Sequence, residues 1–503
     1  MGTYKVLKQR WHEAARLDEI AGLMHWDQAV VMPQGGSKAR AEHLAILAQH
    51  SHELRTGEDV AGLIQAAQDE DLGPWDRHNL ELIAQAWRKQ ALVPSQLVAD
   101  LSAAAMACET AWGQARDHDD FSLVSEALAK SFSLTRDRAN LLADALDKDP
   151  YDVLLDDFEP GLTQAYIDPI FADYSAFLPD FLAQVMARQA QAPKVLVPEG
   201  PFEIADQRAL GEALTQRLGF DFTQGRLDVS RHPFCGGHRG DIRMTVRYDR
   251  ADFTSALMGL LHETGHSLYE AGLPVDYLTQ PVGQAAGMAA HESQSLLIEM
   301  QACRSDAFLE FLAPQVRQRF GGTGPAWQTD NLIRLYRQVR PGTTRVDADE
   351  VTYPAHIMLR YELEKALFQG DLAIADLPAA FDAGLEARLG LRPKSDFEGV
   401  LQDIHWYSGG FGYFPTYTLG AMTAAQLFAA ARISIAEQGH SLESDLAAGD
   451  FSRLLTWLRC HIHGRGRMET TDAMLISATG RSLDPACFQA HLRARYLGSV
   501  VIN

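Results

Sequence analysis

The stretch ALMGLLHETGHSL, residues 256–268, places an apolar run directly before the pattern H-E-x-x-H. Residues four apart lie on one face of an α-helix, so His262 and His266 can present two imidazoles to one metal ion. Glu263 lies about 100° further round the helix, where it can reach a metal-bound water rather than the metal. Zinc peptidases use this arrangement, and the pattern therefore predicts a hydrolytic metal centre.

Local signals predict that this motif lies on a helix over residues 253–270. Asp252 and Thr254 are suitable N-caps, and Gly272 and Pro274 supply a stop. The apolar stripe expected to face a core consists of Leu257, Leu261, Gly265 and Leu268. The alternative is a chance H-E-x-x-H among the eighteen histidines of the chain, with both imidazoles in the core or exposed.

The third metal ligand has two candidates in a second expected helix, residues 289–300. A catalytic zinc usually takes three protein ligands and keeps one position for water. No H-x-x-G-x-x-H pattern follows His266, so a third histidine close behind is unsupported. Glu292 and Glu299 share a face of the second helix because they are seven residues apart. The polar cluster 291–295 favours Glu292 as the ligand, and Glu299 is expected to form a salt bridge or to support a ligand.

A series of short motifs, taken in order, resembles the signatures of the carboxypeptidase Taq family of metallocarboxypeptidases. The motifs are His232-Pro233-Phe234; Asp241-Ile242-Arg243-Met244-Thr245; the H-E-x-x-H pattern; His291-Glu292-Ser293-Gln294; Arg345-Val346-Asp347-Ala348-Asp349; and Gly399-Val400-Leu401-Gln402-Asp403-Ile404-His405-Trp406. Flanks such as 151–161 and 412–417 extend the likeness over nearly the whole chain. The resemblance implies that Glu292 is the third ligand of one divalent ion per chain. Zn²⁺ is expected and Co²⁺ is the alternative, because this donor set accepts both.

The resemblance also implies an exopeptidase that removes single residues from the C-terminus of a peptide. Glu263 would accept a proton from the metal-bound water and pass it to the leaving amine. The tetrahedral intermediate needs further donors for its oxyanion. Tyr413 and His405 are the candidates, because related thermolysin-like peptidases use a Tyr and a His from a late segment, and Tyr417 is a second candidate. The alternative for the tyrosines is aromatic packing in the Gly-rich stretch 408–417.

A carboxypeptidase must also bind a free carboxylate, which matches the planar fork of a guanidinium. Arg345 is the leading candidate because it lies in a signature and follows the turn-like residues 341–343. Arg243 is the alternative. It lies in the stretch 241–248, whose period-two pattern predicts a strand that could pair with substrate backbone, and it could instead bridge to a structural acid. His232 is expected to line the substrate cleft.

Acidic residues close to these arginines leave two interpretations open. Asp347, Asp349 and Glu350 could cap a helix, or one of the two aspartates could orient an active-site Arg or His. Asp403 and His405 could form a supporting pair near the site.

The pattern of the whole chain predicts a mainly α fold. Helical patterns dominate the 503 residues, and the few strands are expected within 193–249, where turn residues gather. No linker or tandem repeat is visible, so residues 1–503 are expected to form a single metallocarboxypeptidase domain, with two lobes around a deep active-site cleft. The resemblance to the carboxypeptidase Taq family implies the same fold, that of a thermolysin-like or neurolysin-like metallopeptidase with a small β-sheet beside the H-E-x-x-H helix.

The composition and net charge of the chain argue against some classes of binding partner. A formal net charge of −21 argues against a broadly basic nucleic-acid face. No apolar run is expected to span a membrane, and the first ten residues lack a signal-peptide core. Five dispersed cysteines fit free thiols in a reducing cytoplasm. The resemblance further implies a homodimer and peptide substrates with a free C-terminus.

Two rival functions remain at this stage. A thermolysin-like oligoendopeptidase or a dipeptidyl carboxypeptidase would carry the same zinc-binding pattern. A helical scaffold with an inactive metal site is the alternative outside the enzymes, and the intact set His262, Glu263, His266 and Glu292 argues against it.

Overall fold

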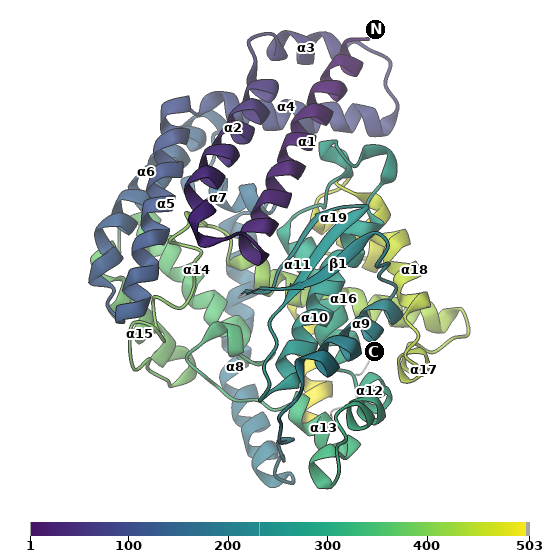
Figure 1. Ribbon diagram of the computed structural model, residues 1–503. Helices are drawn as coiled ribbons and strands as arrows, with labels where there is room; N and C mark the ends of the chain where they lie inside the picture. The colour runs from purple at the N-terminus through teal and green to yellow at the C-terminus, as the bar shows by residue number, and fades with distance from the viewer. Residues whose placement is uncertain (1, 231, 499–503) are drawn as a thin grey trace. The chain divides into compact units, whose positions relative to one another are not determined.

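The computed structural model describes residues 2–230 and 232–498. Most of these residues are helical, as the periodicity of the sequence predicts (Figure 1). The expected mainly α fold with a small sheet is confirmed. The chain divides into two compact units, each assembled from separate stretches of sequence. That the whole chain forms a single domain stays a prediction.

The first unit comprises Met1–Gln90, Lys194–Arg337 and Thr423–Leu483. Its helices are α1 (Thr3–Val30), α2 (Ser37–Thr56), α3 (Val60–Ala67), α9 (Ile204–Arg217), α10 (Phe253–Gly272), α11 (Met288–Leu296), α12 (Asp306–Arg319), α13 (Thr329–Tyr336), α17 (Leu442–Ala447), α18 (Ser452–His461) and α19 (Thr471–Thr479). A π-helical segment, Leu297–Cys303, continues α11.

The second unit comprises Ala91–Pro193, Gln338–Met422 and Asp484–Asn503. Its helices are α5 (Ser95–His118), α6 (Ser122–Leu146), α7 (Pro150–Phe158), α8 (Gln164–Gln191), α14 (Tyr353–Gln369), α15 (Leu377–Leu389) and α20 (Pro485–Leu492). Two helices, α4 (Pro74–Leu92) and α16 (Pro415–Glu437), run through the sequence boundaries between the units.

The sheet of the first unit has the strand order β1-β3-β2. The strands are β1 (Gly225–Val229), β2 (Cys235–His238) and β3 (Asp241–Val246), all within the stretch where strands were expected. β3 pairs in parallel with β1 and antiparallel with β2. The expectation that this strand could pair with substrate backbone is wrong, because neighbours already occupy both of its hydrogen-bonding edges.

One face of the sheet packs on α10. Ile242, Met244 and Val246 alternate along β3 and are buried in one cluster with Ala256 and Leu260 of the helix. The sheet thus fixes α10 by an apolar contact, as the alternation of β3 requires.

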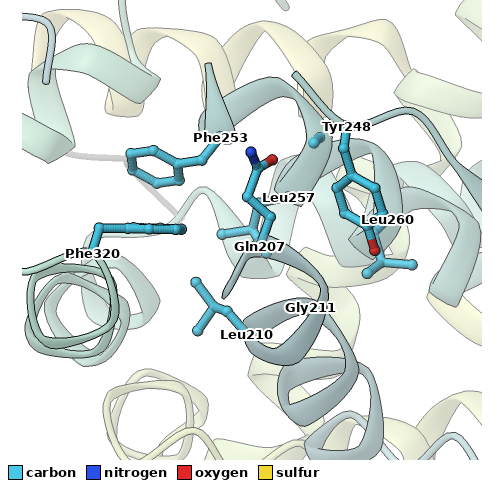
Figure 2. A pocket seen from close by; sticks show the side chains of 9 residues that line it. Gln207, Leu210, Gly211, Tyr248, Phe253, Leu257, Leu260 and Phe320 are labelled. Carbon is cyan, nitrogen blue, oxygen red and sulfur yellow. The ribbon is translucent and has the colours of Figure 1, made fainter. Parts of the chain in front are cut away.

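A small pocket lies along the face of α10 that carries Phe253, Leu257 and Leu260, against Leu210 and Gly211 of α9 (Figure 2). His262 follows Phe253 by nine positions, which is two and a half helical turns. This face of α10 therefore points away from the histidines. The pocket is therefore distinct from the expected metal centre.

α16 departs from one expectation. By length and composition this helix could cross a membrane, whereas no run was expected to approach that length. Its most apolar window is 61% buried in the protein, as is usual for a core helix. All five cysteines, each in the described part of the chain, are free thiols.

Candidate metal centre

α10 begins where its cap was expected. The Asp252 carboxylate accepts a hydrogen bond from the backbone N–H of Thr254 at 2.8 Å, and the helix ends at Gly272, two residues beyond the expected end. On this helix the rings of His262 and His266 lie edge to face with centroids 5.0 Å apart. Helical spacing therefore brings both imidazoles to one side, as the motif requires.

A glycine brings the candidate third ligand within reach. A Cβ atom at Gly265 would lie 2.5 Å from the carbonyl oxygen of Gln294, so α11 can approach α10 this closely only because the side chain is absent. Across this contact, Oε2 of Glu292 lies 3.4 Å from Nε2 of His266 and 3.9 Å from Nε2 of His262. Ligand atoms of the three residues all lie within 4.8 Å of one another.

This donor set fits a divalent cation. Two imidazole nitrogens and one carboxylate oxygen match the three protein ligands of a catalytic zinc-type site. Glu263 and Glu299 add two more buried carboxylates, so negative groups outnumber the imidazoles. A cation bound among these groups would offset their mutual repulsion.

Glu299 sets the orientation of His262. Its Oε2 lies 3.0 Å from Nδ1 of His262, and its Oε1 accepts a hydrogen bond from Arg304 at 2.7 Å. Burial would raise the pKa of Glu299, but Arg304 and His262 lower it below its usual value. An ionised carboxylate only accepts, so Nδ1 of His262 donates to Glu299, and Nε2 is the ring atom left to bind a cation once its own proton is displaced.

His266 is oriented by a different chain of partners. Its Nδ1 lies 2.7 Å from Nδ1 of His291, and Nε2 of His291 lies 2.9 Å from Oε1 of Glu270. With the Glu270 carboxylate as acceptor, His291 donates through Nε2 and accepts through Nδ1. His266 must then donate through Nδ1, which leaves its Nε2 as a ligand atom. The supporting roles of His291 and Glu270 were missed in the sequence, although Glu270 follows His266 by one helical step of four residues.

The electrostatics follow from burial among carboxylates. Burial raises the pKa of Glu263 to about 7. Burial would lower the pKa of His262, but Glu292, Glu299 and Glu263 raise it to about 10. Burial and the neighbouring His291 lower the pKa of His266 to about 4. A cation that binds here displaces the His262 proton, so its affinity depends on pH.

In the second unit, four of the predicted residues form one cluster. Nε2 of His405 lies 3.1 Å from the Tyr417 hydroxyl, and the His405 ring is 5.3 Å from the ring of Tyr413. The guanidinium of Arg345 lies 5.0 Å from the centre of the Tyr417 ring. The structure thus brings the candidate carboxylate anchor and the candidate oxyanion donors together.

The acid that holds Arg345 is Asp403. Nε and Nη2 of Arg345 donate to Oδ1 of Asp403 at 2.9 and 2.6 Å, and Nε of Arg360 donates to Oδ2 at 2.7 Å. The two guanidinium groups share one carboxylate, which leaves an excess positive charge. Asp349 instead accepts backbone hydrogen bonds from Arg340 and from Thr352, the N-cap residue of α14, so it holds the turn that leads into this helix.

Comparison with known proteins shows the family of the chain. The model of the carboxypeptidase Taq (M32) metallopeptidases matches residues 6–496. The chain is 34% identical to thermostable carboxypeptidase 1 of Thermus thermophilus over 98% of both chains, and 33% identical to carboxypeptidase 1 of Bacillus subtilis over 95% of both. The solved structure of Trypanosoma cruzi metallocarboxypeptidase 1 superposes with a TM-score of 0.95 at 38% identity, covering 98% of this chain and 99% of that one.

The chain belongs to the carboxypeptidase Taq (M32) family. It is therefore a metal-dependent peptide hydrolase that acts at the C-terminus of its substrates. The family's divalent metal matches the donor set of His262, His266 and Glu292.

Two further residues nominated in this M32 carboxypeptidase have other contacts. Arg243 makes a two-pronged pair with Asp241 at 2.9 Å for both bonds, and its guanidinium lies 4.3 Å from the centre of the Trp26 ring. Its fork is therefore engaged with a structural acid, which was the alternative for it. His232 is exposed, and its backbone carbonyl accepts a hydrogen bond from the Ser230 hydroxyl at 2.6 Å. Its role in lining the cleft stays a prediction.

Proposed function

We propose that this M32 carboxypeptidase releases single C-terminal amino acids by attack of a metal-activated water, with Glu263 as general base and then general acid. The observation that carries the proposal is the convergence of His262, His266 and Glu292 on one point from two helices, with Glu263 beside them. When bound, a divalent cation polarises the scissile carbonyl and lowers the pKa of a bound water.

Glu263 suits both proton transfers. It is only 7% exposed, and burial raises the pKa of its carboxyl to about 7. A bound cation would favour the ionised form of this carboxyl, which can then take the water proton and return it to the leaving amine. Because Glu263 lies outside the ligand triad, its protonation leaves the three ligand atoms in place.

We assign substrate binding to the cluster around Arg345. Arg345 carries the excess positive charge that a C-terminal carboxylate would offset, with Arg360 and Asp403 behind it. We assign His405, Tyr413 and Tyr417 as donors to the oxyanion, and burial lowers the pKa of His405 to about 4, which keeps its ring neutral. A neutral imidazole with one N–H can serve as such a donor.

The test is a time course of peptide products followed by mass spectrometry, with and without a chelator. A ladder of single-residue losses that vanishes with the chelator is the expected result. A peptide blocked as its C-terminal amide should resist cleavage. Internal cleavage of that amide would establish the endopeptidase, release of dipeptides would establish the dipeptidyl enzyme, and an intact free peptide would leave only the scaffold.

The proposal includes Zn²⁺ as the native ion, a homodimer, a cytoplasmic location and the deep cleft of thermolysin-like and neurolysin-like metallopeptidases. The donor set supports zinc but accepts Co²⁺. Metal analysis of protein purified without added metal, together with light scattering of the same sample, tests the ion and the oligomeric state.

A further inference from the structure

Glu364 is a fully buried carboxyl group that the proposed reaction does not use. It lies on α14, one helical step beyond Arg360. Such a group is costly to bury unless hydrogen bonds satisfy both of its oxygens.

Three donors surround this carboxyl. Oε1 accepts from the indole N–H of Trp406 at 2.7 Å. Oε2 accepts from the backbone N–H of Gly412 and from the hydroxyl of Tyr151, each at 2.7 Å. Glu364 therefore ties together α14, α7 and both ends of the segment 406–412.

The segment 406–412 has no regular hydrogen-bonded helix or strand of its own. Gly412 has φ +90°, and a Cβ atom there would lie 2.8 Å from the backbone carbon of Leu154 on α7. Only a glycine takes this conformation so close to another backbone, and it aims the Gly412 N–H at Glu364. The next residue is Tyr413, and the residue before Trp406 is His405.

The three bonds survive a change of protonation. Burial raises the pKa of Glu364 to about 7, so the group is a neutral acid in part of the population. A protonated Oε2 can donate to Tyr151, whose hydroxyl both gives and accepts, while the indole and the Gly412 amide keep their acceptors. A glutamine cannot do this, because its NH₂ group faces one of the two donors that never accept.

We propose that Glu364 is a positioning residue for the hydrolysis: it pins the segment 406–412 at both ends and so places His405 and Tyr413 for the substrate. The inference rests on the proposed function of those two residues. Two residues of the flanks that extended the resemblance, Tyr151 and Gly412, are thereby tied to Glu364.

The experiment compares three variants that each disturb one bond of the group. Glu364→Gln and Trp406→Phe disturb bonds to the segment, whereas Tyr151→Phe removes a bond that ends outside it and serves as the matched control. We measure kcat and KM for single-residue release, zinc affinity, thermal unfolding and amide hydrogen exchange across 405–413.

Both segment variants should lose about 10- to 100-fold in kcat/KM, the order expected when a reacting group moves by about 1 Å. Their zinc affinity should stay within about twofold of wild type, and exchange of the Gly410 and Gly412 amides should accelerate in Glu364→Gln. The double variant should be no worse than the poorer single one, because once the indole N–H is gone the glutamine NH₂ can take its side and leave the amide oxygen for Gly412 and Tyr151. Tyr151→Phe should lose stability and keep kcat/KM within about threefold.

Equal loss of kcat/KM in all three variants, in step with their loss of stability, would make Glu364 merely structural and overturn the inference. Wild-type kcat/KM in Glu364→Gln would overturn it as well. A different result would show that the proposed function itself is wrong: the wild-type protein would then release no single C-terminal residues. In that case unchanged exchange in Glu364→Gln would still overturn the pinning of the segment.

Discussion

At the scale of single residues, the two imidazoles of the metal centre are prepared by unlike partners. His262 donates to a carboxylate that Arg304 also holds, whereas His266 donates to a second imidazole that is backed by Glu270. Both arrangements leave Nε2 as the ligand atom. The hydrogen bonds that link His266 through His291 to Glu270 depend on one neutral acceptor nitrogen. This support is therefore more easily lost than the one that Glu299 gives to His262.

We therefore expect His291→Ala to weaken zinc binding by about 10- to 100-fold, since His266 then loses the acceptor that fixes its tautomer. Competition with a fluorescent chelator measures the affinity. His50→Ala is the control, because that imidazole is exposed on α2. Unaltered zinc affinity in His291→Ala would show that His266 needs no such partner.

Glu263→Gln should separate chemistry from metal binding. The amide cannot accept the water proton, so kcat should fall by about 10²- to 10⁴-fold. Bound zinc should remain near one ion per chain, because Glu263 is not among the converging ligand atoms. Wild-type turnover would refute the general base, and loss of the ion would move Glu263 into the ligand set.

At the scale of elements, the junction of α10 with α11 depends on Gly265. A Cβ atom there would meet the Gln294 carbonyl oxygen at 2.5 Å and Ser295 Cα at 2.6 Å, and these backbone atoms cannot rotate away. We expect Gly265→Ala to cost about 1–3 kcal/mol of unfolding free energy and to weaken zinc binding, because Glu292 moves with α11.

A second glycine on the same helix is the control for that variant. A Cβ atom at Gly259 would meet nothing within 4 Å, so Gly259→Ala should stabilise the protein by about 0.5–1 kcal/mol through helix propensity. Urea unfolding and zinc titration of both variants make the comparison. If Gly265→Ala matched Gly259→Ala in both measurements, the close contact at Gly265 would contribute neither to stability nor to zinc binding.

The burial of Glu364 on α14 predicts a pH-dependent stability. Burial raises its pKa from 4.5 to about 7, so the folded protein keeps a proton that the unfolded chain has released. The resulting stabilisation is complete below pH 4.5 and is lost as pH rises through 7, about 3 kcal/mol in all. Glu364→Gln lacks this titration, so its destabilisation relative to wild type should be larger at pH 5 than at pH 8. Urea unfolding at the two pH values checks the sign, and a penalty that grows with pH would contradict it.

At the scale of the whole molecule, features that depend on nearby residues could be predicted from the sequence, and contacts between distant residues could not. The α10 helix, its cap and the shared face of His262 and His266 are local, and their spacing was sufficient. Glu292 and Glu299 could not be separated by spacing, because both face the same histidine, one toward Nε2 and the other toward Nδ1. Only packing between helices decides which nitrogen each carboxylate meets.

Longer-range pairings were beyond any pattern in the chain. Asp403 holds Arg345 from 58 residues away, so proximity in sequence pointed wrongly to Asp347 or Asp349. Likewise β3 looked able to receive a substrate strand, because alternation reveals a strand but not its neighbours in the sheet. Such pairings are properties of topology, which period and composition do not encode.

A bound metal ion should also stabilise the first unit more than the second. All three candidate ligands belong to the first unit, where a cation would join α10 to α11 and offset the repulsion among Glu263, Glu292 and Glu299. A ligand at about a thousand times its Kd adds about 4 kcal/mol to the folded state that binds it. Calorimetry with a chelator should therefore lower the transition of the first unit by several degrees and restore it when zinc returns. Glu292→Gln should unfold at the same temperature with or without chelator; an equal chelator shift in that variant would place the stabilising ion elsewhere.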